Sequence, residues 1–315
     1  MTQPAVSVAI PLYNKADFIV DTVASVLAQT FADFEIVVVD DGSIDDGAAR
    51  LRQFADPRLT VIGQNNAGVA TARTRAMREG RGIYVAFLDA DDIWFPGHLS
   101  HLMELSRRFP QATLFGNDFA ERSESSTKLQ YEAIGAVQYR TVEDYFAECA
   151  FGRAPFYTSS CMVLRQRALD IGGFPVGNYC GEDLALWMML AADAPVAVSN
   201  FVGCHYRRGI DSLSLQPSYR NAMDVSMSTL DDILKRHREW PDARKSAVRE
   251  YYFRIALAHC LDCFRAGEFK HAKDYLRLAA GTQMQRRRLW EARVLAYAPG
   301  PLRGILFRLS DLRRA

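Results

Sequence analysis

The stretch VAFLDADDIW, residues 85–94, passes directly from apolar residues to three acids. The β-branched and aromatic residues before the acids are typical of a buried strand. Asp89, Asp91 and Asp92 follow at its carboxyl end, where like charges repel one another unless a cation relieves the cost. The stretch therefore predicts one of two features: a divalent cation site, or a solvated acidic turn that caps the next helix.

Strands and helices alternate along the first 92 residues. The apolar pattern predicts strands at 6–13, 34–43, 59–64 and 82–92, and helices at 16–29, 45–55 and 67–80. This alternation indicates βαβ units and a mostly parallel sheet in an α/β fold. Ligands of such sheets lie beyond the carboxyl ends of the strands. Asn14, Asp40, Asp41 and the acids at 89–92 all fall there, which predicts one shared crevice.

The composition is that of a globular protein without a polyanionic partner. The chain has 315 residues, of which 49% are hydrophobic and 24% charged, and its net charge of +1 does not suggest nucleic acid. The six cysteines have no framework spacing, and the CxxC at 260–263 lacks a second pair, so neither disulfides nor zinc are expected. Without a signal-peptide pattern or a membrane-spanning run, we expect a cytoplasmic location.

The sequence divides into three parts that differ in the pattern of apolar residues and in charge. Residues 1–215 carry the α/β pattern, residues 216–280 form a helical annex with a helix pair around Gly267, and residues 281–315 form a basic tail. The tail has eight arginines against Glu291 and Asp311, a local balance of +6. Its mixture of arginine with Leu, Trp, Ile and Phe predicts either contact with an anionic membrane or a terminal helix packed on the annex.

Two further motifs near the predicted crevice have a functional and a structural interpretation. In VVVDDGS (37–43), a carboxylate can accept hydrogen bonds from a base or a ribose, but Asp-Gly-Ser is also an ordinary helix start. In NNAGVATARTR (65–75), Arg73 can pair with a diphosphate or stack on a base, or it can be a surface charge.

Two downstream motifs are equally open when taken alone. Glu182 and Asp183 begin an apolar helix, where acids stabilise the helix dipole, although either could be a general base for a hydroxyl. In CHYRRGIDSLS (204–214), His205 and Arg207 can stabilise a leaving diphosphate or simply end a strand.

Together these motifs resemble family 2 glycosyltransferases of the GT-A fold. The resemblance is carried, in order, by VSVAIPLYNKADFIVDTVASVLAQTFADFEIVVVDDGSIDD, NNAGVATAR, YVAFLDADDIWFPGHL and GEDLALWMML, and it covers residues 5–215. It implies a Rossmann-like mixed, mostly parallel sheet flanked by helices. It also implies a nucleotide-sugar donor, usually a uridine diphosphate sugar, and Mn²⁺ or Mg²⁺ as cofactor.

The resemblance also assigns roles to individual residues. Those that match donor nucleotide-binding positions are Pro11, Tyr13, Asn14, Asp40, Asp41, Gly68, Arg73, Asp89 and Ala90. Asp91 matches the metal ligand, with Asp89 contacting ribose and metal, and Asp92 is expected to matter least. Asp183 matches the catalytic base, with Glu182 orienting the acceptor, and His205 and Arg207 match the diphosphate-binding positions.

The implied reaction is a single inverting displacement by an acceptor hydroxyl on a saccharide or lipid-linked saccharide. Family members of this type build surface polysaccharides, so peripheral contact with the inner face of the cytoplasmic membrane is also expected. Two positions depart from the family pattern: Thr74–Arg75 replaces the common Asn-x after Arg73, and Gly209 replaces a common His. The alternatives are a non-catalytic nucleotide-sugar-binding scaffold and a metal-dependent phosphohydrolase, although the latter carries its nucleophile on the first strand.

Overall fold

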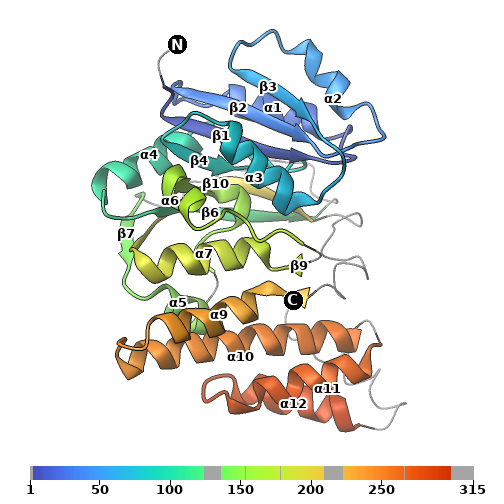
Figure 1. Cartoon of the computed structure of the whole chain (residues 1–315), viewed down its shortest axis with the longest axis vertical. Helices are drawn as coiled ribbons and strands as arrows, with labels where there is room; N and C mark the ends of the chain where they lie inside the picture. Colours follow the sequence, from blue (N-terminus) through green and yellow to red (C-terminus); the bar gives the residue numbers. More distant parts are fainter. Residues whose placement is uncertain are drawn as a thin grey trace.

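A computed structural model describes residues 3–123, 136–152, 154–177, 179–208, 223–265 and 267–298. Within these residues the chain forms one nine-stranded sheet with helices on both faces, and a further layer of helices at one end (Figure 1). The strand order is β3-β2-β1-β4-β8-β6-β10-β5, and β7 pairs with β10. The mixed, mostly parallel sheet flanked by helices is the architecture that the sequence predicts.

The first half of the sheet is parallel, as the alternating pattern requires. Its strands are β1 (Val6–Leu12), β2 (Phe34–Asp40), β3 (Leu59–Gly63) and β4 (Tyr84–Phe87). They are connected through α1 (Ile19–Leu27), α2 (Gly47–Arg50), the 3₁₀ turn η1 (Leu51–Gln53) and α3 (Val69–Glu79). Leu12 pairs in register with Asp40, and Asp40 with Gly63. The residues that follow β1 and β2 therefore emerge at the same edge.

The second half of the sheet contains the antiparallel strands. Its strands are β5 (Ile93–Trp94), β6 (Leu114–Ser123), β7 (Tyr139–Val142), β8 (Cys161–Leu164) and β10 (Val196–Arg208). The short strands β9 (Tyr179–Cys180) and β11 (Met223–Asp224) form a separate pair. The helices are α4 (His98–Arg108), α5 (Tyr145–Phe151), η2 (Thr158–Ser160), α6 (Arg165–Asp170) and α7 (Glu182–Asp193). Because β8 runs antiparallel between β4 and β6, the η2 turn before it lies beside the end of β4.

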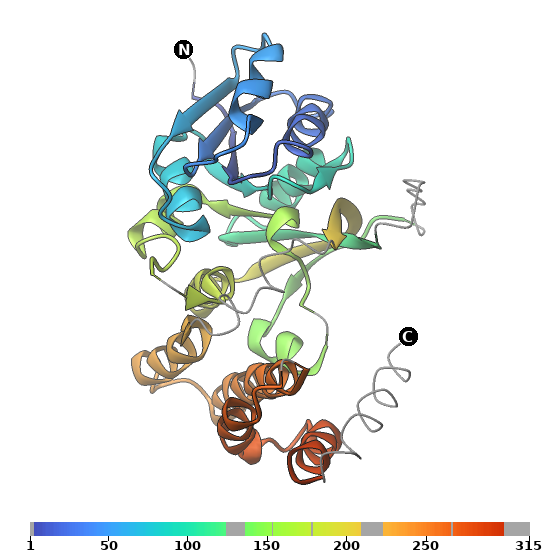
Figure 2. The same ribbon diagram turned by 90° about the vertical axis from the view of Figure 1, so that its right-hand side faces the viewer.

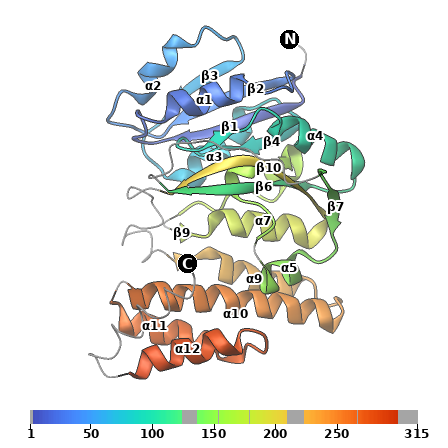
Figure 3. The same ribbon diagram turned by 180° about the vertical axis from the view of Figure 1, so that it is seen from behind.

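Each face of the sheet has its own hydrophobic core. One core packs α1 and α4 against the even-numbered residues of β1, on the face seen in Figure 3. The other core packs α3, α5 and α7 against the opposite face and continues into the C-terminal helices. β1 and β2 are buried on both faces, which explains why they are apolar almost throughout, whereas β3 at the edge of the sheet is partly exposed.

The C-terminal helices lie at the end of the molecule opposite α2 and β3 (Figure 2). They are α9 (Val225–Arg236), α10 (Asp242–Arg265), α11 (Phe269–Leu278), the 3₁₀ turn η4 (Ala279–Gly281) and α12 (Arg286–Tyr297). Two helices flank Gly267, as the sequence predicts. The predicted boundary at 215/216 and residues 299–315 of the predicted tail lie outside the described residues.

The described part of the basic tail packs on the annex. In α12, Leu289, Ala292, Leu295 and Ala296 are buried and belong to the same core as α10 and α11. The connection before α12 is fixed by Glu250, which accepts hydrogen bonds from the Thr282 hydroxyl and from the Gln283 amide, both at 2.7 Å. No helix among the described residues is long and apolar enough to cross a membrane.

Two predicted elements are shorter than expected. The strand predicted at 82–92 ends at Phe87, so the three acids occupy a turn between β4 and β5. The helix predicted at 45–55 is limited to α2 and η1, because its residues are mostly exposed and little apolar surface holds them.

Candidate active site

The carboxyl ends of β1, β2 and β4 open into a cavity of about 390 Å³ that α3, η2, α7 and the end of β10 complete. The predicted residues that line it are Pro11, Tyr13, Asp41, Gly68, Arg73, Asp89, Ala90, Asp91, Glu182, Asp183 and Arg207. Segments separated by more than a hundred residues therefore contribute to one cavity, at the edge where a parallel sheet binds its ligands.

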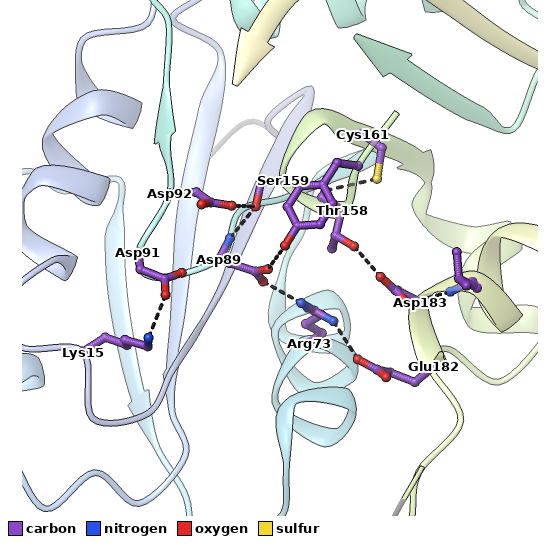
Figure 4. Close-up of polar contacts among 12 residues, drawn as sticks. Lys15, Arg73, Asp89, Asp91, Asp92, Thr158, Ser159, Cys161, Glu182 and Asp183 are labelled. Atoms are coloured by element: carbon purple, nitrogen blue, oxygen red, sulfur yellow. Dashed lines mark hydrogen bonds and ion pairs between the residues drawn. The ribbon is translucent and has the colours of Figure 1, made fainter. Parts of the chain in front are cut away.

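The acids after β4 have three different environments (Figure 4). Asp89 Oδ1 lies 2.5 Å from Nη2 of Arg73, and Asp89 Oδ2 accepts a 3.4 Å hydrogen bond from the Tyr157 hydroxyl. Asp91 Oδ2 lies 2.7 Å from Nζ of Lys15. Both acids line the cavity, and each already has a cationic partner. The repulsion among the acids is thus relieved by side chains of the protein itself.

Asp92 is the third acid of this turn, and it does not line the cavity. It is fully buried, and its carboxylate accepts hydrogen bonds from the Ser159 hydroxyl at 2.6 Å and the Arg207 amide at 2.9 Å. Burial and then the charge of Asp89 raise its pKa well above the ordinary value. The sequence ranks Asp92 last of the three acids. Its two hydrogen bonds link η2 and the end of β10 to the acidic turn.

Arg73 is buried and forms ion pairs with acids from two distant segments that line the cavity. Its Nη2 contacts Asp89, and its Nη1 lies 3.1 Å from Oε1 of Glu182. Burial opposes the charge of Arg73, but the carboxylates of Asp89 and Glu182 raise its pKa, so the guanidinium stays charged. The guanidinium also lies over the ring of Phe174 at 5.5 Å. The surface-charge interpretation of Arg73 is therefore wrong.

The departure at Thr74 has a local explanation. Its hydroxyl accepts a hydrogen bond from the Phe174 amide at 3.1 Å, in the segment that supports Arg73. Arg75 points away from the cavity and bonds the Gly63 carbonyl at 3.0 Å.

Glu182 and Asp183 begin α7, and they have different partners. Gly181, which precedes them, has φ of 71°, a left-handed conformation that glycine adopts at little cost. Asp183 Oδ2 accepts a 2.7 Å hydrogen bond from the Thr158 hydroxyl, and its Oδ1 accepts one from the Leu184 amide at 2.8 Å. Glu182 is buried, and burial together with the charge of Asp183 raises its pKa to about 7, against the effect of Arg73. A short hydrogen bond from a hydroxyl therefore orients the Asp183 carboxylate at the cavity.

Asp41 is held by the loop before α3. It is buried and accepts hydrogen bonds from the Gln64 side chain at 2.7 Å, the Ala67 amide at 2.9 Å and the Gly68 amide at 2.8 Å. Gly68 has φ of 88°, which lets its amide face Asp41. Pro11 and Tyr13 line the cavity beside Asp41.

Three predicted residues do not line the cavity. Asp40 accepts a hydrogen bond from the Ser43 amide at 3.1 Å, and Asn14 Oδ1 accepts one from the Ile44 amide at 2.9 Å. Both side chains close turns behind the cavity wall, because short polar side chains bond to nearby backbone. The His205 ring packs against Phe95 with ring centroids 5.6 Å apart. Arg207, two residues later, lines the cavity.

Lys15, Tyr157 and Thr158 are polar residues of the cavity to which the sequence interpretation assigned no role. Thr158 is the first residue of η2, and Tyr157 directly precedes it. This turn reaches the cavity only because β8 inserts beside β4. Nothing in the periodicity of residues 151–161 signals that placement. Lys15 lies within the first of the sequence stretches that resemble the family, but its partner Asp91 is 76 positions away in the chain.

The donor set suits a hard divalent cation shared with a phosphate ligand. Among the residues that the structure describes, no three His, Cys, Asp or Glu side chains converge as a complete metal site. Asp89 and Asp91 supply two carboxylates on one wall of the cavity. Mg²⁺ and Mn²⁺ commonly take one or two carboxylates from the protein and the other ligands from phosphates and water. Asp91 is the stronger candidate, because both oxygens of Asp89 already have partners.

The chain matches the protein-family model described as Glycosyl transferase family 2 over residues 7–172. WfgD of Escherichia coli, named as a UDP-Glc:alpha-D-GlcNAc-diphosphoundecaprenol beta-1,3-glucosyltransferase, is 28% identical over 212 residues, covering 66% of this chain and 79% of WfgD. The succinoglycan biosynthesis protein ExoW of Rhizobium meliloti (strain 1021) is 30% identical over 273 residues, covering 78% of this chain and 83% of ExoW.

Solved structures share the fold at low sequence identity. TarS of S. aureus in complex with UDP-GlcNAc has a TM-score of 0.65 and 16% identity, and the match covers 96% of this chain and 89% of the TarS chain. The mannosyltransferase PcManGT from Pyrobaculum calidifontis, in complex with GDP-Man and Mn²⁺, has a TM-score of 0.62 and 18% identity over 99% of this chain and 88% of PcManGT. These likenesses extend through the C-terminal helices.

Proposed function

Because the chain belongs to glycosyl transferase family 2, we propose that it transfers a sugar from a uridine diphosphate sugar to an acceptor hydroxyl, with inversion at the sugar C1. One observation carries this proposal. Asp41, the Asp89–Asp91 pair and Asp183 come from three distant segments and line a single cavity of about 390 Å³. We assign these acids to the nucleoside, the diphosphate and the acceptor, respectively.

The nucleoside end is proposed at Asp41, with Pro11 and Tyr13 beside it. Asp41 already organises the 64–68 loop; its Oδ1 accepts two hydrogen bonds and its Oδ2 accepts one, so Oδ2 retains a lone pair for a base N–H. Tyr13 is 42% exposed, so its ring is accessible for stacking. A uridine donor is favoured because WfgD is named for UDP-Glc and TarS was solved with UDP-GlcNAc.

Mn²⁺ or Mg²⁺ is the proposed cofactor, and PcManGT was solved with Mn²⁺. Asp91 would hold the ion and Asp89 would contact the ion and the ribose. When bound, such an ion neutralises charge on the diphosphate and so stabilises it as a leaving group. The guanidinium of Arg207 lies over the ring of Phe18 at 4.5 Å and lines the same part of the cavity. It is the proposed cation for the departing diphosphate.

Asp183 is the proposed general base. Its carboxylate takes the proton from the acceptor hydroxyl while that oxygen attacks C1 of the sugar. The bond between C1 and the diphosphate oxygen breaks, and its electron pair leaves with the diphosphate. The Thr158 hydrogen bond fixes the orientation of Asp183, which lies in the first turn of α7. Glu182 is paired with Arg73 and is proposed to position the acceptor side of the cavity.

A donor panel tests this function directly. Melting of the protein with Mn²⁺ is measured in the presence of UDP-, GDP- and dTDP-sugars, and slow hydrolysis of each donor is followed. We expect a UDP-sugar to raise the melting temperature and to be hydrolysed. Asp91→Ala should reduce the metal-dependent part of both effects. If no nucleotide sugar alters melting, and Asp91→Ala changes nothing, the transferase assignment of this cavity is wrong.

A lipid-linked saccharide is the proposed acceptor, which requires contact with the inner face of the membrane. WfgD is named for a diphosphoundecaprenol acceptor. Arg286, Trp290, Arg293 and Tyr297 recur at helical spacing along the outer face of α12, and the two aromatic side chains are 66% and 74% exposed. Exposed aromatic and basic side chains on one helix face are suited to an anionic lipid surface.

The membrane surface is tested with point variants rather than by deletion, because α12 packs on α10 and α11. Arg286→Gln with Arg293→Gln is expected to lower flotation with phosphatidylglycerol vesicles about 10- to 30-fold, since each basic residue contributes about 1 kcal/mol near such a surface. Arg107→Gln with Arg108→Gln removes the same charge from α4 and is the matched control. Equal flotation of both double variants would contradict this surface.

A further inference from the structure

Lys15 forms an ion pair with Asp91, the acid that is proposed to hold the metal. Nζ of Lys15 lies 2.7 Å from Oδ2 of Asp91, and the two side chains are 20% and 25% exposed. Both residues line the cavity, and Figure 4 shows them on the far side of Asp89 from Arg73. Neither the proposed base nor the proposed nucleoside site uses this lysine.

The backbone on both sides of Lys15 is anchored. Asn14 has a positive φ of 51°, and its amide donates a 3.1 Å hydrogen bond to the Ser43 hydroxyl. On the other side, the Ala16 amide donates to Asp45 Oδ2 at 2.9 Å. The loop after β2 therefore fixes the turn after β1. Because the turn is fixed and the side chain has four rotatable carbons, the ammonium can change partner while its Cα stays in place.

A second cation lies next to Lys15. Nζ of Lys15 and the guanidinium of Arg207 lie 5.7 Å and 4.5 Å from the centroid of the same ring, that of Phe18. The Arg207 amide is held by Asp92, so the position of this arginine is fixed by the acidic turn. Two cations gathered over one ring at the Asp91 end of the cavity exceed what the single carboxylate of Asp91 requires. The surplus suits a polyanion such as a diphosphate.

We propose that Lys15 is the resting counter-ion of Asp91, and that it passes to the diphosphate of the donor when a divalent ion takes Asp91. This inference rests on the proposed function of the cavity. The ion pair is partly solvated, so it is weak enough to exchange. The ammonium competes with a metal ion for the same carboxylate oxygen, which disfavours metal binding without donor. Once a diphosphate is present, the displaced ammonium gains a new partner, so metal and donor bind together.

The test measures Mn²⁺ and UDP binding rather than turnover. In Lys15→Met, we expect Mn²⁺ alone, followed by electron paramagnetic resonance, to bind about two- to fivefold more tightly, because a competing ion pair of this exposure is worth up to about 1 kcal/mol. UDP in the presence of saturating Mn²⁺ should bind about tenfold more weakly, since a charge-assisted contact is lost. Lys15→Arg should keep UDP affinity close to that of the unaltered protein.

Lys235→Met is the matched control. It removes the same charge from an exposed pair with Asp232, 2.9 Å apart on α9. Changes in Mn²⁺ and UDP affinity of opposite sign in Lys15→Met, absent from Lys235→Met, support the proposal. Unchanged Mn²⁺ affinity, or a fall in both affinities, overturns it, and thermal melting identifies a variant that has merely lost its fold. Neither measurement needs a sugar or an acceptor. Failure of this inference can therefore be distinguished from failure of the proposed function, which the donor panel tests.

Discussion

Replacing Asp183 by Asn is expected to abolish sugar transfer while donor binding is retained. Removal of a positioned general base costs about 10²- to 10⁴-fold in rate. Asn is close to Asp in shape: its Oδ1 can accept the hydrogen bond from the Leu184 amide, and its side-chain NH2 can donate one to the Thr158 hydroxyl. The lost function is therefore the capacity to take a proton. The measurement is kcat for transfer to an acceptor, together with UDP affinity by calorimetry.

Thr158→Val tests the same proposed base with a smaller expected effect. It removes the hydroxyl that bonds Asp183 Oδ2 at 2.7 Å but leaves the carboxylate in place. Transfer should fall about tenfold, less than in Asp183→Asn, because the base is present but less well oriented. Glu182→Gln tests the other acid of the pair. If Glu182→Gln abolishes transfer and Asp183→Asn does not, the base has been assigned to the wrong residue.

The fold and the position of the cavity could be predicted from the sequence because their signals are local. β1, β2 and β4 are short apolar runs, and each is followed at once by a turn or an acid. Once these strands are parallel neighbours, their carboxyl ends must meet at one edge. Asp41, Asp89 and Asp91 could therefore be assigned to one crevice without knowing any distance between them.

The partners of these residues could not be predicted, because they come from distant segments. Arg73 lies between Asp89 and Glu182, 16 and 109 positions away. Thr158 reaches Asp183 only because the antiparallel strand β8 carries η2 to the end of β4. The pattern of apolar residues indicates which face of an element is buried. It does not indicate which polar side chains meet there.

For three residues, the sequence predicted a ligand contact at a position that does not line the cavity: Asp40, Asn14 and His205. Asp40 ends β2, Asn14 lies just after β1, and His205 lies near the end of the long strand β10; each motif position suggested a ligand contact. In the structure Asp40 and Asn14 bond to nearby amides, and His205 packs on Phe95. Small polar side chains at strand ends have a local use in closing turns, and the sequence does not distinguish that use from ligand binding.

Arg73→Met is expected to cause the largest loss of stability among the cavity variants. It leaves the buried carboxylate of Glu182 and the partly buried one of Asp89 without their cation. Breaking a buried ion pair by removing one partner costs about 3 to 5 kcal/mol. Urea unfolding at pH 8 measures this cost. Arg107→Met, which removes an exposed arginine from Glu104, should leave the free energy of unfolding unchanged.

The pH dependence of this loss identifies its cause. Burial and Asp183 raise the pKa of Glu182 from 4.5 to about 7, so the folded protein keeps a proton that the unfolded chain releases. The stability due to this proton is present below pH 4.5 and is lost as pH rises to about 7, a change of about 3 kcal/mol. Without Arg73, which lowers the pKa of Glu182, this decline extends to higher pH.

The loss in Arg73→Met should therefore be smallest near pH 5 and should grow as the pH rises above 7. Adding Glu182→Gln removes the unpaired charge, so the double variant should recover part of the stability at pH 8 and little at pH 5. A loss that does not vary with pH, and that Glu182→Gln does not repair, would mean that Arg73 acts through packing on Phe174 instead. In that case the link between the acidic turn and α7 is not electrostatic.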